Sequence, residues 1–159
     1  MFKFIGAIIV IGAAGLIGMS RYSQLYERKR TLSLISDGAE KIHNNLKCMC
    51  MPLYECFLSG GEFFGKAAKK IADGASPGEA VREVAYTMSS LTQEDISIIE
   101  RFSEGLSAHN CDGQMRNTEL FINELSRNIE KSAEDLETKG KLTVKGSILV
   151  AAAVVLVLI

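Results

Sequence analysis

A region between residues 91 and 114 crowds together the side chains that most often carry acid–base or nucleophilic chemistry. Its members are Glu94, Asp95, Glu100, Glu104, His109 and Cys111. General acid–base catalysis needs a carboxyl group whose pKa is shifted by burial or by a close like charge. Adjacent side chains on a helix diverge by about 100°, which separates Glu94 from Asp95, and Glu100 and Glu104 share a face predicted to be solvated. We predict no catalytic residue here, and instead take Glu94, Glu100 and Glu104 as candidate partner-facing residues.

The cysteines raise the questions of a thiol nucleophile and of a metal site. A nucleophilic pair of His109 and Cys111 would fall in a predicted loop without any sign of an oxyanion hole. Cys48 and Cys50 form a C-x-C pair, not the C-x2-C pair of zinc sites, and no second pair mirrors it. A site of Cys50 and Cys56 with His43 is a weaker alternative to free thiols that act as small apolar side chains. We predict no metal ligand and no cofactor.

Composition limits the class of protein. The chain has 159 residues, of which 47% are hydrophobic, and a net charge of -1. This balance gives no basic patch for nucleic acid. With 2 prolines, no tryptophan and no strand-like alternation in its middle, the sequence predicts an all-α protein.

Both ends of the chain are apolar enough to predict membrane spans. Residues 2–19 are apolar apart from Lys3, and residues 146–159 form a second, shorter apolar run. Counting back to Leu142, with Lys145 reaching the membrane interface, gives this second run the length of a span. A cleaved signal peptide is the alternative for the first run, but its length and the helical pattern after it favour a retained anchor. We therefore predict an anchor at 1–19, a helical domain at 20–141 and a second span at 142–159, with membrane lipid as a partner.

The charges beside the two runs predict the orientation. Basic residues follow the first run at Arg21, Arg28, Lys29 and Arg30, and precede the second at Lys139, Lys141 and Lys145. By the positive-inside rule, residues 20–145 are expected in the cytoplasm and both termini outside. Small residues in the first run, Gly12, Ala14, Gly15 and Gly18, are candidates for close helix packing, with a generic Gly/Ala-rich anchor as the alternative.

The middle of the chain has the periodicity of helices and clear helix breakers. A seam from Leu25 to Met49 predicts one long helix that ends before Pro52. Gly60-Gly61 and Gly74 separate shorter helices, and the Ser76–Glu79 spacing predicts a capping box. Thr92 is the predicted N-cap of a helix that carries Asp95 as a first-turn charge and is expected to end near Ala108. A last long helix is expected to begin after Asp112, its predicted N-cap, with an apolar seam at Met115, Ile122, Leu125, Ile129 and Leu136. We predict an antiparallel bundle in which two long helices continue into the terminal spans and the shorter helices close the cytoplasmic end.

The order and spacing of these features resemble the stage III sporulation protein AB family of endospore-forming bacteria. The residues that carry the resemblance are the KFIGAIIVIGAAGLIG anchor with Arg21-Tyr22, Pro52-Leu53-x-Glu55, Phe102-x-Glu104-x-Leu106, Asp112-Gly113-Gln114, and Gly146 with its apolar tail. The chain departs from the family pattern in its Cys48, Cys50 and Cys56 cluster and in the lack of a glycine within Ser107-Ala108-His109.

The resemblance implies a non-enzymatic platform in the mother-cell membrane, part of a secretion-like complex between mother cell and forespore. That family is similar to the inner-membrane platform proteins of type II secretion and type IV pilus systems. By this analogy the expected partners are other stage III sporulation proteins, above all the stage III sporulation protein AA ATPase, and a second copy of the chain is a further candidate. A small membrane-bound enzyme that depends on a thiol or a metal is the alternative.

Overall fold

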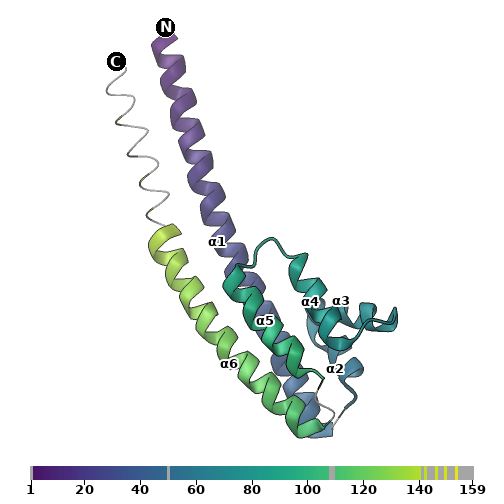
Figure 1. Cartoon of the computed structure of the whole chain (residues 1–159). Helices are drawn as coiled ribbons and strands as arrows, with labels where there is room; N and C mark the ends of the chain where they lie inside the picture. The colour runs from purple at the N-terminus through teal and green to yellow at the C-terminus, as the bar shows by residue number, and fades with distance from the viewer. Residues whose placement is uncertain are drawn as a thin grey trace. The chain divides into compact units, whose positions relative to one another are not determined.

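Figure 1 shows the computed structural model of the chain. It describes the backbone of residues 2–49, 51–107 and 110–140 and of positions 142, 146, 149 and 153. Side chains are described at residues 13 and 16, at 18–48, and at the same later positions.

The described residues form helices joined by short turns. The helices are α1 (Phe2–Met49), α2 (Leu53–Ser59), α3 (Gly61–Ala72), α4 (Pro77–Tyr86), α5 (Gln93–Gly105) and α6 (Cys111–Asp135), and a π-helical turn (Leu136–Gly140) follows α6. No strand occurs in the part of the chain that the structure describes. The predicted all-α class is confirmed.

The chain divides into two compact units. One unit is residues 30–130, and the other is residues 1–29 together with 131–159. The helices α1 and α6 contribute to both units, whereas α2 to α5 belong wholly to the first.

The core of the 30–130 unit is built on the seam of α1 that periodicity predicts. Five residues of that seam are buried: Leu32, Ile35, Ala39, Ile42 and Leu46. Aromatic rings continue the core through the shorter helices. The ring centroids of Phe57 and Phe64 lie 5.2 Å apart, those of Phe64 and Phe102 6.2 Å apart, and Phe102 stacks on Phe121 of α6 at 4.1 Å. One apolar core therefore joins α1, α2, α3, α5 and α6 in this unit.

The shorter helices begin and end where local chemistry requires. In the predicted capping box of α4, the Ser76 hydroxyl accepts from the Glu79 N–H and the Glu79 carboxylate accepts from the Ser76 N–H. Gly61, the first residue of α3, has φ 84°, and Gly74, in the turn after this helix, has φ 103°; glycine tolerates these backbone angles best.

The start of α6 corrects a prediction. The helix begins at Cys111, so Asp112 lies in its first turn and is not the N-cap. The cap is Asn110, whose Oδ1 accepts from the Gly113 N–H at 3.0 Å. Asn and Asp both suit an N-cap. The path of the loop before α6 decides whether Asn110 or Asp112 caps the helix. The preceding helix, α5, ends at Gly105, earlier than the predicted stop near Ala108, a residue outside the described ones.

Antiparallel contacts link α1 to the end of α6 within the other unit. Arg28 Nη1 of α1 lies 3.9 Å from Asp135 Oδ2. The other carboxylate oxygen of Asp135 pairs at 2.7 Å with Lys139 Nζ, one turn further along the same segment. Further along, a Cβ on Gly140 would meet the Tyr22 ring at 3.1 Å, so the backbone of the π-helical turn lies directly on this ring. Position numbers fall on α1 as they rise on α6, and the predicted antiparallel pairing is seen here.

Within the described residues, no helix is both long enough and apolar enough to cross a membrane. Most side chains of the first predicted span lie outside the described residues, as do nearly all positions from 141 onward. The two predicted spans and the predicted boundaries at 19/20 and 141/142 therefore stay predictions.

Candidate interaction surface

The candidate surface is built on α5, whose start is fixed by a capping box. The Thr92 N–H donates to Asp95 Oδ2 at 2.9 Å, and the Thr92 hydroxyl donates to the same oxygen at 2.6 Å. In return the Asp95 N–H donates to Thr92 Oγ1 at 3.4 Å. The predicted N-cap is confirmed, and its partner is Asp95 at the third helical position.

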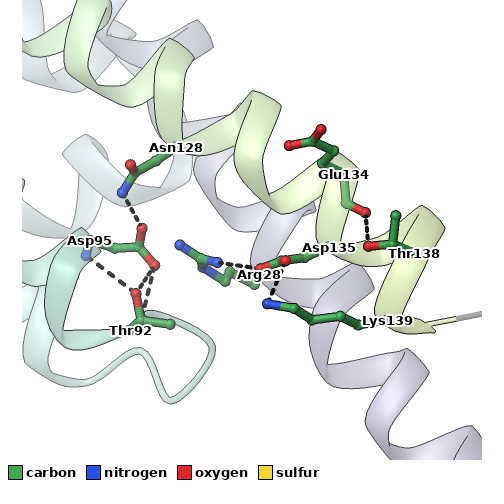
Figure 2. Close-up of polar contacts among 8 residues, drawn as sticks. All are labelled: Arg28, Thr92, Asp95, Asn128, Glu134, Asp135, Thr138 and Lys139. Atoms are coloured by element: carbon green, nitrogen blue, oxygen red, sulfur yellow. Dashed lines mark hydrogen bonds and ion pairs between the residues drawn. The ribbon is translucent and has the colours of Figure 1, made fainter. Parts of the chain in front are cut away.

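Asp95 also reaches across to α6, a role that sequence reasoning missed. Its side chain is fully buried, with 0% relative exposure. Figure 2 shows the Asn128 amide pointing at this carboxylate, and Asn128 Nδ2 donates to Asp95 Oδ1 at 2.7 Å. A buried carboxylate is tolerated when its oxygens accept hydrogen bonds. The pair fixes the start of α5 against the middle of α6, and no sequence signal marked it, because Asn128 lies off the predicted apolar seam of this helix.

The three candidate glutamates of α5 differ in their surroundings. Glu94 and Glu104 are exposed. Glu100 is half-buried and accepts a hydrogen bond from the Tyr86 hydroxyl of α4. This hydrogen bond, helped by desolvation and by the negative charge of Glu100, raises the pKa of Tyr86. Glu100 therefore helps to join α4 to α5, while Glu94 and Glu104 face solvent.

A shallow groove of about 200 Å³ lies between α5 and α6. Its lining residues are Ile98, Arg101, Phe102, Asn117, Leu120, Phe121 and Glu124. Arg101 Nη2 and Glu124 Oε2 form an ion pair at 2.9 Å across it. At one end Asn117 Nδ2 donates to the Phe102 carbonyl at 2.9 Å and so caps the C-terminus of α5. The groove has an apolar floor with one acid and one base at its edge.

The thiols do not converge in the described part of the chain. Cys48 is exposed, whereas Cys56 is buried and its thiol lies 3.5 Å from the Met51 carbonyl. Burial, with a smaller effect of the neighbouring Glu55 charge, raises the pKa of Cys56, which keeps it protonated. The Cys111 thiol donates to the Leu46 carbonyl at 3.4 Å.

Two members of the predicted alternatives, Cys50 and His109, lie outside the described residues. His43 is half-buried beside a hollow of about 470 Å³ that it shares with Lys47, Asp112, Met115, Arg116 and Glu119. Among the residues that the structure describes, no group of three or more His, Cys, Asp and Glu side chains is placed to hold a metal ion.

A known protein family matches nearly the whole length of the chain. The family model of stage III sporulation protein AB matches residues 3–159. The chain belongs to this family. No curated protein and no solved structure matches it significantly.

Membership of the stage III sporulation protein AB family confirms the resemblance seen in the order and spacing of the sequence features. It assigns the chain a role in stage III of sporulation, within a family that is not a known enzyme family. Of the small residues predicted to pack helices, Gly18 is buried, while the surroundings of Gly12, Ala14 and Gly15 lie outside the description.

Proposed function

We propose that this protein is a non-enzymatic membrane platform of the secretion-like complex between mother cell and forespore. Its helical domain, residues 20–141, extends into the mother-cell cytoplasm and presents a surface to a motor ATPase. The terminal runs at 2–19 and 142–159 anchor it, with both termini outside. The observation that carries the proposal is the family match over residues 3–159.

The antiparallel pairing of α1 with the end of α6 supports the anchoring part of the proposal. The two helices approach each other at Arg28–Asp135 and at Tyr22–Gly140, so Tyr22 and Gly140 lie at the same end of the pair. Beyond each of these residues the chain continues into an apolar run. Two runs that start together and are both flanked by basic residues fit a two-pass protein.

The outer face of α5 supports the partner-presenting part. Glu94 and Glu104 are exposed there. Exposed carboxylates on a rigid helix favour a basic partner surface and steer its approach. The expected partner is the stage III sporulation protein AA ATPase, and the observations above do not require any chemistry from α5 itself.

A cross-linked pull-down of the full-length protein from sporulating cells tests the proposal. We expect recovery of stage III sporulation proteins, with the ATPase among them, and reduced recovery of the ATPase from a Glu94→Lys/Glu104→Lys variant. The matched control is Glu119→Lys, which changes the charge of an exposed glutamate on α6. Recovery of no component of the complex would reject the platform role.

The alternative, a thiol- or metal-dependent membrane enzyme, makes an opposite prediction for the cysteines. Replacing Cys48, Cys50, Cys56 and Cys111 together by alanine or serine should leave sporulation intact if the protein is a scaffold. Spore counts that collapse while the protein still accumulates in the membrane would favour the enzyme.

A further inference from the structure

An apolar side chain stands exposed beside the α5–α6 groove. Leu120 of α6 is 60% exposed, and the groove that it borders has Ile98, Phe102 and Phe121 as its apolar lining. A single exposed leucine is common on protein surfaces and indicates nothing alone. Here, however, the leucine and a hollow that could receive a leucine belong to the same surface.

The size of the groove suits one side chain. An apolar cavity of about 150 Å³ holds a benzene-sized group, and this groove measures about 200 Å³. It is too small and too open for an extended peptide or a large cofactor. An occupant would insert one branched aliphatic side chain between the two helices.

The charges beside Leu120 are arranged symmetrically about it. Arg116 precedes Leu120 by one helical turn and Glu124 follows it by one turn, so all three lie along one side of α6. If two α6 helices pack antiparallel about a two-fold axis at Leu120, Arg116 of each copy faces Glu124 of the other. The Arg116–Glu124 pair then forms twice, once on each side of the axis, and no two like charges on α6 lie directly opposite each other.

The Glu124 carboxylate can accept Arg116 of the second copy as a further partner. It is 40% exposed by side chain and already accepts from Arg101 of its own chain at 2.9 Å. An ionised carboxylate has lone pairs for several donors, so the arginine of a second copy can be added without breaking the existing pair. A basic partner would compete with Arg101, and an acidic one would meet Glu124, so the face matches itself better than it matches either.

We propose that the α5–α6 groove is a self-association surface, through which two copies of this chain pair about a two-fold axis with Leu120 of each in the groove of the other. The inference concerns the 30–130 unit alone and does not depend on the motor-presenting role. Because the groove is shallow and has one anchor, the pairing is weak in dilute solution. Confinement of both copies to one membrane would raise their effective concentration.

Disulfide trapping of the full chain in cells tests the proposal. The Leu120→Cys substitution is placed in a chain whose four native cysteines are replaced by alanine, and the cells are treated with a mild oxidant. A two-fold axis at position 120 brings the two introduced thiols together, so we expect a covalent dimer. The matched control is Leu34→Cys on α1, a leucine of similar exposure, 54%, in the same unit.

Reversing the charges beside position 120 in the Leu120→Cys chain tests the proposed ion pairs as well as the leucine contact. Arg116→Glu should lower the yield of the dimer several-fold. Adding Glu124→Arg together with Arg101→Glu should restore it, because both opposed pairs and the Arg101–Glu124 pair within each chain are then reversed together. Equal cross-linking at positions 34 and 120 would overturn the proposal, as would a loss that the second reversal does not repair. A cross-link from position 120 to a different protein in place of the second copy would also overturn it. Loss of helical content in the cysteine-free parent would move the test to the native background, where Leu120→Asp should lower the yield of dimer that a chemical cross-linker traps from the full-length protein in its membrane, and an unchanged yield would reject pairing.

Discussion

A fully buried carboxylate holds α5 against α6 in this protein. Asp95 accepts hydrogen bonds from the Thr92 N–H, the Thr92 hydroxyl and the Asn128 amide. Burying a carboxylate without partners costs several kcal/mol, roughly, and removing one donor from a buried charge leaves much of that cost uncompensated. The arrangement therefore fixes the relative position of the two helices more than it adds to stability.

The Asn128→Ala variant tests this role. Loss of a hydrogen bond to a buried charged group should lower the free energy of unfolding by about 1.5–3 kcal/mol. Asn123→Ala, on the exposed face of the same helix, should change it by less than about 0.5 kcal/mol. Urea unfolding of the full-length protein in detergent, followed by circular dichroism, measures both. Equal effects at the two positions would show that the Asp95–Asn128 bond contributes nothing.

A second carboxylate, in the capping box of α4, should make stability depend on pH. The Glu79 carboxylate accepts from the Ser76 hydroxyl at 2.7 Å and from the Ser76 N–H at 3.2 Å, and these bonds hold the pKa of Glu79 below its ordinary value of 4.5. A lowered carboxyl pKa stabilises the fold at pH values above the ordinary pKa, and this contribution is lost as pH falls through the folded-state pKa.

The Glu79→Gln variant should therefore melt at a lower temperature than the native protein near neutral pH. The difference should shrink as the pH falls below about 4.5, the ordinary value. Thermal melts of both proteins across this range measure the effect. The exposed Glu119→Gln serves as the control and should show no such convergence, and a Glu79→Gln difference that stays constant with pH would contradict the assignment.

At the scale of the element, periodicity predicted the apolar faces but not the polar ones. Most of the predicted seam of α1 is buried, from Leu32 to Leu46, because apolar side chains at helical spacing have one stable place to go. Leu25, at the start of that seam, is half-buried, and the side chain of Met49 lies outside the described residues. The seam predicted for α6 was wrong in part. It was expected at Met115, Ile122, Leu125, Ile129 and Leu136, whereas the buried positions are Thr118, Phe121, Leu125, Asn128 and Ser132.

The error on α6 has a physical reason. Met115, Ile122 and Ile129 are half-buried at the edge of the contact, and the centre is taken by polar side chains that find partners. The Thr118 hydroxyl donates to the Gln114 carbonyl at 2.7 Å, and Asn128 donates to Asp95. A hydrophobicity pattern cannot find a buried polar residue, because its burial depends on a partner elsewhere in the fold. For the same reason Asp95 was interpreted as a first-turn charge.

The close approach of α1 to the α2–α3 turn at Gly38 gives a prediction about helix packing. Sequence propensity predicts that Gly38 weakens α1 and that alanine would be better there. In the structure a Cβ at Gly38 would lie 2.1 Å from the Gly60 carbonyl oxygen. Gly38→Ala must push α1 away from the α2–α3 turn and should destabilise the unit by about 1–3 kcal/mol or more.

Gly65→Ala in α3 is the matched variant. Nothing lies within 4 Å of a Cβ at Gly65, so alanine should stabilise the protein by up to about 1 kcal/mol through helix propensity alone. Urea unfolding of the two variants should give changes of opposite sign. Stabilisation by both substitutions would show that α1 does not approach Gly60 this closely.

At the scale of the whole molecule, the family and the all-α class were accessible from the sequence, whereas the two compact units were not. A long helix such as α1 carries one continuous pattern, and nothing in its sequence marks where one set of neighbours ends and another begins. The Arg28–Asp135 ion pair and the close approach of Gly140 to Tyr22 show that the 1–29 and 131–159 segments form a paired unit of their own.

This pairing can be tested through the two leucines that lie within it. Leu25 is midway between Tyr22 and Arg28, and Leu136 follows Asp135, so both fall in the paired region and both are half-buried. With the native cysteines replaced, Leu25→Cys/Leu136→Cys in the full chain should form an intramolecular disulfide on mild oxidation, because side chains on facing helices come within bonding range.

The control pair is Tyr26→Cys/Leu136→Cys. Tyr26 is the next residue along α1 and is 50% exposed, so its side chain is turned about 100° away from that of Leu25. We expect a gel-mobility shift for the first pair and little for the second. Equal shifts would mean that the two segments slide or rotate freely, and α1 and α6 could not then deliver the two terminal runs to a membrane as a fixed pair.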